Sequence, residues 1–277
     1  MSREFEALAA KIAERAGELA KNMRVRGDLS VESKTSAVDM VTEADRATEK
    51  LITKLLFAER PDDAFLGEES GQSGTSKTGI TWVIDPIDGT TNYLYGLSAA
   101  CVSIAATVAS NNPDYDTTVW QGDNGAPKRR TIAAAVYNPF TEEMFTASAG
   151  NGSTLNGKPI RVSENVNLAT SLIGTGFGYS AERRAAQAEI LAGLLPRVRD
   201  IRRLGSAAYD LCLLAAGRLD GYYEWGIQEW DFAAGALIAA EAGASLLGRA
   251  DGSTPGSALF IAANHDLALQ LQAVVGT

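Results

Sequence analysis

The sequence has 277 residues, 45% of them hydrophobic and 21% charged, a composition typical of a globular protein with its own core. The formal net charge of −9 argues against a basic nucleic-acid groove, and no stretch reaches the ~20 uninterrupted apolar residues needed to span a bilayer. Charged residues interrupt the N-terminal stretch where a signal peptide would have its apolar core, so we expect a cytoplasmic location. We expect neither a nucleic acid nor a membrane as partner.

The first part of the chain predicts two helices followed by strands. Apolar residues recur every three or four positions from Phe5 to Met23, which indicates an amphipathic helix. Thr42 or Asp45 caps a second helix, which Pro61 stops. The polar segment 110–130 is predicted to be a surface loop. Short apolar runs predict strands at "AFLGEES", "TWVIDP", "AACVSIAATVA", "TIAAAVYNPF" and "EMFTASAG".

The second part alternates strands with helices. Strands are predicted at "SLIGTGFG", "DIRRLG", "GYYEWG" and "ALFIAAN". Helices are predicted at "SAERRAAQAEILAGLLPRV", "SAAYDLCLLAAGRLD" and "DFAAGALIAAEAG", with a last one at the C-terminal end. Such alternation is typical of an α/β unit. We therefore expect two joined lobes, an α+β lobe over residues 1–150 and an α/β lobe over residues 151–277.

Side chains that commonly carry out catalysis are scarce. The single histidine, His265, falls between a predicted strand and a predicted helix, where a surface position is expected. Cys101 and Cys212 lie in apolar runs typical of buried thiols. Histidine triads, Cys–His chemistry and multi-histidine zinc sites are thereby disfavoured, so catalysis must rest on carboxylates, hydroxyls and backbone groups. The basic clusters at 128–130 and 197–203 are interpreted as solvated charge.

Acidic residues stand at the ends of several predicted elements: Asp45, Glu68, Asp85, Asp88 and Asp231. Each alone has a simpler interpretation as a turn residue or a helix cap. Together they form an all-oxygen ligand set of the kind that Mg²⁺ prefers, and such sites leave positions for water and a substrate phosphate. In "WVIDPIDGTTN" a glycine follows the second acid, which allows backbone N–H groups to approach a phosphate.

Three of these segments, "WVIDPIDGTTN", "GEES" and "WDFAAGALIAAEAG", resemble the signature motifs of the inositol monophosphatase family of Mg²⁺-dependent, lithium-sensitive phosphatases. The similarity extends over nearly the whole chain, through "SAVDMVTEADRATEKLI", "AAVYNPFTEEMFTA", "LNGKPIRVS" and "YYEWGIQEWD". The resemblance implies a layered αβαβα sandwich, as in fructose-1,6-bisphosphatase, and a homodimer. It also implies hydrolysis of inositol monophosphate by a metal-activated water, without a phosphoenzyme.

The resemblance further implies a role for each matching residue, with most metal ligands in the first lobe. The expected ligands of two Mg²⁺ ions are Glu68, Asp85, the carbonyl of Ile87, Asp88 and Asp231, and Glu68 is also expected beside a weaker third ion. The residues expected to orient the attacking water are Thr90, Asp45 and Glu68. The residues expected to bind the phosphate and the alcohol are Asp88, Gly89, Thr90, Gly205, Ser206, Ala207 and Glu224. Segment 34–36 resembles the loop that closes over the metals.

A few departures from the family pattern leave alternatives open. The helix motif ends in "EAGA", Gln228 and Glu229 replace a segment that often carries His-Cys, and the 110–130 loop is longer than usual. These differences leave the substrate pocket and the subunit contacts undecided. A phosphatase of histidinol phosphate or of another polyol or sugar phosphate is therefore the alternative. A catalytically silent regulatory binding protein is the non-enzymatic alternative, which predicts the loss of at least one metal ligand.

Overall fold

The computed structural model describes residues 2–27, 31–33, 40–110, 119–120 and 129–276. Its helices are α1 (Ser2–Arg26), α2 (Glu43–Glu59), α3 (Thr90–Tyr95), α4 (Ala181–Leu194), α5 (Ala207–Ala215), α6 (Glu229–Glu241) and α7 (His265–Val275). The strands from the first part of the chain are β1 (Val31–Ser33), β2 (Met40–Thr42), β3 (Ala64–Gly67), β4 (Gly71–Ser73), β5 (Thr81–Asp88), β6 (Cys101–Ala109), β7 (Val119–Trp120), β8 (Arg129–Asn138) and β9 (Glu143–Ser148). The later strands are β10 (Ser153–Leu155), β11 (Lys158–Pro159), β12 (Leu172–Thr175), β13 (Asp200–Arg202), β14 (Gly221–Glu224), β15 (Ser245–Leu247) and β16 (Phe260–Ala263).

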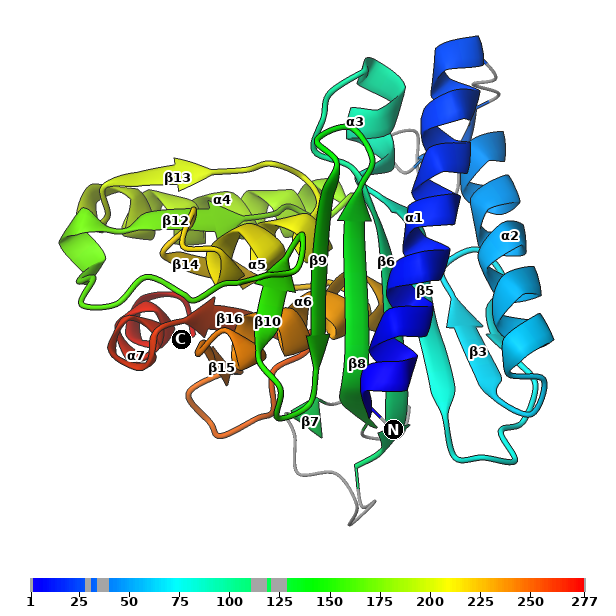
Figure 1. The fold of residues 1–277 in the computed structure, drawn as a ribbon. Helices are drawn as coiled ribbons and strands as arrows, with labels where there is room; N and C mark the ends of the chain where they lie inside the picture. Colours follow the sequence, from blue (N-terminus) through cyan, green and yellow to red (C-terminus); the bar gives the residue numbers. More distant parts are fainter. Residues whose placement is uncertain (1, 28–30, 34–39, 111–118, 121–128, 277) are drawn as a thin grey trace.

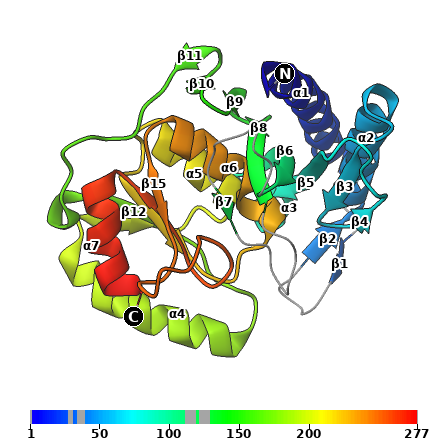
Figure 2. The same cartoon turned by 90° about the horizontal axis from the view of Figure 1, so that it is seen from below.

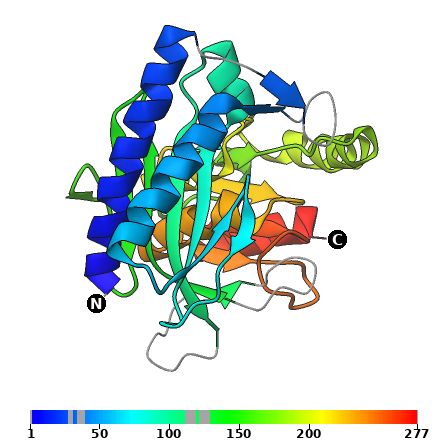
Figure 3. The same cartoon turned by 90° about the vertical axis from the view of Figure 1, so that its right-hand side faces the viewer.

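The first sheet is largely antiparallel and has the order β11-β10-β9-β8-β6-β5-β3-β4, with β7 paired to β8. Its two faces follow from the alternation of side chains along each strand. On β5, Trp82 and Ile84 pack with Phe5 of α1 and Ile52 of α2. Val83 points to the opposite face, into the core that contains α5 and α6. Figure 3 shows α1 and α2 lying across the outer face of this sheet.

The second sheet has the order β13-β12-β14-β16-β15, with β12, β13 and β14 parallel and β15 and β16 antiparallel. Tyr222 of β14 faces α5 and α6, whereas the next residue, Tyr223, faces α7. Figure 2 shows the resulting order of layers, with α5 and α6 between the two sheets and α7 outside the second. The αβαβα sandwich expected from the resemblance is confirmed.

Two details of the chain differ from the sequence expectations. First, strands β10 and β11, which the sequence did not predict, extend the first sheet although they lie beyond residue 150. The division of the chain into two lobes stays a prediction. Arg129, expected among solvated charges, is only 8% exposed, and its Nε lies 3.4 Å from Glu229 Oε2. The expectations for segment 34–36 and for most of the 110–130 loop fall outside the described residues. No described helix is both long and apolar enough to cross a bilayer.

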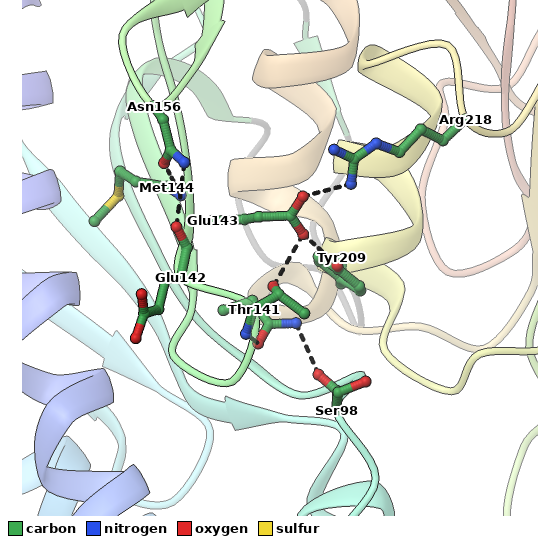
Figure 4. Close-up of polar contacts among 9 residues, drawn as sticks. Ser98, Thr141, Glu142, Glu143, Met144, Asn156, Tyr209 and Arg218 are labelled. Atoms are coloured by element: carbon green, nitrogen blue, oxygen red, sulfur yellow. Dashed lines mark hydrogen bonds and ion pairs between the residues drawn. The ribbon is translucent and has the colours of Figure 1, made fainter.

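A polar cluster ties the first sheet to α5 (Figure 4). The carboxylate of Glu143, on β9, accepts a hydrogen bond of 2.5 Å from the Tyr209 hydroxyl of α5. It also accepts bonds from Arg218 Nη1 at 2.5 Å and from Thr141 Oγ1 at 2.9 Å. One carboxylate therefore joins β9 of the first sheet to α5 and to Arg218, which follows that helix.

Candidate active site

A cavity of about 500 Å³ lies where the end of β5 meets the first turns of α5 and α6. Most of the residues expected to form a site line it: Glu68, Asp85, Ile87, Asp88, Gly89, Thr90, Gly205, Ser206, Ala207, Glu224 and Asp231. Asp45 does not line the cavity but contacts Thr90, which does. The structure thus brings together residues from distant parts of the sequence.

The acidic end of β5 is shaped by an irregularity in its pairing with β6. Asp85 is opposite Ser103, and the next pair is Asp88 with Cys101, so β5 has one residue more than its partner strand. Such a bulge bends a strand and redirects its side chains. Within it the Ile87 N–H donates a 3.0 Å hydrogen bond to Asp85 Oδ1. The bulge explains how successive acids of one strand reach the same cavity.

Asp88 connects this strand end to α5. Its Oδ2 atom accepts a 2.8 Å hydrogen bond from Ser206 Oγ and a 2.7 Å bond from the Ala208 N–H. The Ala208 N–H lies in the first turn of α5, where backbone donors have no partner inside the helix. Asp88 therefore caps α5 from the other half of the chain and fixes Gly205, Ser206 and Ala207 at the cavity wall.

Gly89 forms the turn between β5 and α3. Its φ of 95° lies in the left-handed region, which glycine adopts without strain. A Cβ at this position would lie 2.7 Å from the carbonyl oxygen of Ala99 and 3.3 Å from that of Gly205. The turn therefore requires glycine for both its conformation and its close contacts.

Thr90 and Asp45 form a hydrogen-bonded pair beside the cavity. Thr90 Oγ1 lies 3.2 Å from Asp45 Oδ1, to which it can donate, and 3.2 Å from the Ile87 carbonyl oxygen. The other oxygen of Asp45 accepts a 2.8 Å bond from the Thr42 N–H at the start of α2. Asp45 thus contributes to the cap of α2, as its simpler interpretation predicts, and also binds Thr90.

Asp231 likewise combines a capping role with a place in the cavity. It is the third residue of α6, and its Oδ2 atom accepts a 2.6 Å hydrogen bond from the Gln228 N–H. The neighbouring Glu229 is buried and pairs with Arg129 of β8. The departure from the family pattern at 228–229 therefore lies in the turn that positions Asp231.

The clustered acids have shifted proton affinities. Burial raises the pKa of Asp85 well above its ordinary value, and the nearby Glu68 charge adds to the shift. Burial likewise raises the pKa of Asp231, followed by the effect of Asp88. For Asp88, burial raises the pKa to about 7, although the Ser206 hydrogen bond opposes the shift. These carboxyl groups therefore resist carrying their full negative charge together.

The donor chemistry fits a hard divalent cation. Among the described residues, no lysine or arginine forms an ion pair with Asp85, Asp88 or Asp231. Buried carboxylates without a cationic partner are costly, and oxygen-coordinated Mg²⁺ is the kind of ion that stabilises them. The same described residues contain no group of three acidic, histidine or cysteine side chains already drawn together as a metal cluster. The acids share a cavity without forming a closed ligand shell.

Glu224 lies at the end of β14, on another part of the wall. The Tyr222 hydroxyl donates a 2.5 Å hydrogen bond to Glu224 Oε2. Burial raises the pKa of Glu224 to about 6, while the Tyr222 bond and the Arg203 charge oppose the shift. A side chain at Gly176 would collide with the Glu224 carboxylate, so this glycine makes room for it.

Sequence reasoning missed several residues of the cavity wall. Asp210 is buried on α5, and Arg203 and Tyr179 come from loops. Asp210 could have been noticed, because an acid inside the apolar run "AAYDLCLLA" is unusual for a buried helix. Arg203, interpreted from sequence as part of a solvated cluster, also lines the cavity.

The scarce histidine and cysteines lie where the sequence predicted them. His265 is exposed at the start of α7, and both thiols are buried and free.

The sequence model of the inositol monophosphatase family matches residues 1–113 and 126–275. The chain belongs to this family. It is 45% identical over 229 residues to an inositol-1-monophosphatase of Mycobacterium bovis, covering 80% of this chain and 72% of the relative. It is also 40% identical over 248 residues to the Nus factor SuhB of Xylella fastidiosa, covering 87% of this chain and 82% of the relative.

Solved structures of the family agree with the fold. The crystal structure of the extragenic suppressor protein suhB from Bartonella henselae matches with a TM-score of 0.84 and 32% identity, covering 97% of each chain. Family membership indicates a phosphatase of a generally metal-dependent kind. The resemblance found in the sequence motifs is thereby confirmed at the level of the family.

Proposed function

We propose that the protein is a Mg²⁺-dependent phosphatase that hydrolyses inositol monophosphate to inositol and phosphate. The observation that carries this proposal is the convergence of Glu68, Asp85, Asp88 and Asp231 on one cavity, next to the Thr90–Asp45 pair. Besides these acids, the cavity wall includes Glu224 at the end of β14. This combination suits a phosphate ester whose alcohol carries further hydroxyl groups.

The acids would hold the metal ions as the family resemblance implies. Glu68, Asp85 and the Ile87 carbonyl would hold one Mg²⁺, and Asp85, Asp88 and Asp231 a second, with Glu68 beside a weaker third. When bound, Mg²⁺ supplies positive charge for the phosphoryl and leaving oxygens and lowers the pKa of water. The raised pKa of the metal-free acids is consistent with a site completed by cations.

The protein's own groups would bind the ester and orient the water. When the Thr90 hydroxyl donates to Asp45, its oxygen can accept a hydrogen bond from the attacking water. Asp45 is held for this purpose by Thr42. The backbone N–H groups of Gly89 and Thr90 would bind phosphate oxygens. No histidine or cysteine is among the described residues that line the cavity, which favours direct attack by water over a phosphoenzyme on such a side chain.

Phosphate release from a panel of substrates tests the proposal. We expect the highest kcat/KM with inositol 1-phosphate, lower values with histidinol phosphate and nucleotide phosphates, and no activity in excess chelator. Lithium should inhibit the reaction. A preference for histidinol phosphate would support the alternative substrate class. Failure to hydrolyse any ester with Mg²⁺ present would favour the silent binding protein, although the ligand loss that this alternative predicts has not occurred.

We also propose that the protein is a homodimer. Sedimentation equilibrium of the purified chain should give twice the mass of 29.2 kDa. A monomer at micromolar concentration would contradict this proposal.

A further inference from the structure

Asp210 lines the cavity but has no role in the reaction proposed above. It lies on α5, is 1% exposed, and borders the cavity. Its Oδ1 atom has no hydrogen-bond partner among the described residues. A buried carboxylate oxygen without a donor is costly, so its presence calls for a physical reason.

The charged surroundings of Asp210 come from three different elements. Burial raises the pKa of Asp210 well above its ordinary value, and the charge of Glu224 is the next largest cause. Asp88 acts in the same direction, whereas Arg203 opposes both. Arg203 also opposes the shift of Glu224, so its positive charge acts on both carboxyl groups. Asp210 and Glu224 both border the cavity. Both also lie beside the same stretch of chain, since a Cβ at Gly174 would be 3.8 Å from Asp210 Cγ and one at Gly176 would collide with the Glu224 carboxylate.

Glu224 leaves hydrogen-bonding capacity open beside Asp210. Its Oε2 atom is occupied by the Tyr222 hydroxyl, but its Oε1 atom has no hydrogen bond to any other described residue. Asp210 lies two residues beyond Ala208, whose N–H is bound to Asp88. Asp210 thus lies in the same turn of α5 as the N–H group that Asp88 binds.

We propose that Asp210 is a second substrate-binding carboxylate, which together with Glu224 accepts hydrogen bonds from hydroxyl groups of a polyol phosphate. This inference rests on the proposed function and extends it by naming the residue pair that selects the alcohol. A polyol supplies the donors that the two carboxylates lack. An ester whose alcohol part has no further hydroxyl group would leave the buried Asp210 oxygen unpaired, and a site with an unpaired polar group rejects such an analogue strongly.

The test compares Asp210→Asn with wild type on two esters. Asparagine keeps the size of the side chain but replaces one acceptor oxygen with a donor. We expect kcat/KM for inositol 1-phosphate to fall about tenfold or more, because the variant loses a hydrogen bond to a charged group. Phenyl phosphate, whose alcohol has no further hydroxyl, should lose less than about twofold. Asp200→Asn is the matched control, since Asp200 is exposed and outside the cavity.

Isothermal titration calorimetry of free inositol measures the affinity that depends on the same contact, without turnover. Asp210→Asn should weaken this binding about tenfold relative to wild type and to Asp200→Asn. Equal losses on both esters, or unchanged inositol binding, would overturn the inference. Absence of hydrolysis by wild type would refute the proposed function alone, because inositol binding still tests Asp210. If Asp210→Asn does not fold, the same measurements are made with Asp210→Ser, which also lacks the carboxylate and has a smaller side chain.

Discussion

Asp88 shows how a single residue can serve the fold and the site together. One of its oxygens caps α5 through Ser206 and Ala208, and the residue also lines the cavity. The capping bonds need only an acceptor, which an amide oxygen provides, whereas a carboxylate binds a divalent cation more strongly than a neutral amide oxygen does. The two roles can therefore be separated by changing the charge alone.

Asp88→Asn should abolish most turnover while the protein stays folded. We expect kcat for inositol 1-phosphate to fall at least about 100-fold, since the variant loses a proposed metal ligand but keeps an acceptor for α5. Steady-state kinetics and circular dichroism measure the two effects. A variant with near-normal kcat would show that Asp88 does not hold a metal.

Tyr222→Phe should weaken recognition of the alcohol without a change in metal requirement. The buried Tyr222 hydroxyl orients Glu224 through a 2.5 Å hydrogen bond, which phenylalanine cannot make. We expect kcat/KM for inositol 1-phosphate to fall roughly threefold to tenfold. The Mg²⁺ concentration for half-maximal rate is the internal control. A large change in that concentration would place Glu224 among the metal ligands instead.

Most residues of the cavity could be predicted because they belong to contiguous motifs. Asp85 through Thr90 occupy one strand end, where the order of acids, glycine and hydroxyl is visible in the sequence. Asp210 and Tyr222 could not be placed in this way. Tyr222 lies in the family-like segment "YYEWGIQEWD" and Asp210 is an unusual acid in an apolar run, but their roles depend on how α5 and β14 pack against each other.

At the scale of elements, Glu143 holds β9 against α5. Burial acts to raise the pKa of Glu143, but hydrogen bonds from Tyr209, Arg218 and Thr141 outweigh it and lower the pKa. A carboxyl group whose folded pKa is lowered stabilises the fold above its unfolded pKa. That contribution is lost as the pH falls through the folded value.

Glu143→Gln should therefore destabilise the protein at neutral pH but not in acid. We expect a loss of about 1 kcal/mol in the free energy of unfolding at pH 7, a modest value because the group is partly solvated. The loss should shrink as the pH falls below about 4. Urea unfolding at both pH values measures it, with the exposed neighbour variant Glu142→Gln as control. A loss independent of pH would show that packing, not charge, accounts for the effect.

Helices with one solvent-exposed face were easier to predict from the sequence than fully buried ones. The outer helices α1 and α2 each have one buried face, so their periodicity was visible in the sequence. The inner helices α5 and α6 are buried on nearly all sides, and only their length and apolar composition indicated helix. The short strands β10 and β11 were not predicted, because they are held by pairing with β9 and with each other.

At the scale of the whole molecule, the acidic cavity should make the metal-free fold sensitive to pH. The pKa of Asp88 is raised from 3.8 to about 7 in the fold. The folded state thus binds this proton more tightly than the unfolded chain, and the resulting stability is present below about pH 4. It is lost as the pH rises through about 7. Asp85 and Asp231 act in the same direction.

Metal-free Asp88→Asn should consequently be more stable than metal-free wild type at pH 8. We expect its Tm to be higher by at least about 2 °C, and the difference to disappear near pH 4. Added Mg²⁺ should raise the Tm of wild type more than that of the variant, because a ligand stabilises the state that binds it. Differential scanning fluorimetry measures all four conditions. Equal Tm values at pH 8 would contradict the raised pKa of Asp88.

The central claim is that the clustered acids bind divalent cations for phosphate hydrolysis. Anomalous diffraction from crystals grown with Mn²⁺, an oxygen-seeking substitute for Mg²⁺, tests it most directly. We predict one peak bounded by Glu68, Asp85 and the Ile87 carbonyl, and a second bounded by Asp85, Asp88 and Asp231. An active protein whose crystals show no peak in this cavity, at Mn²⁺ concentrations that support turnover, would contradict the account.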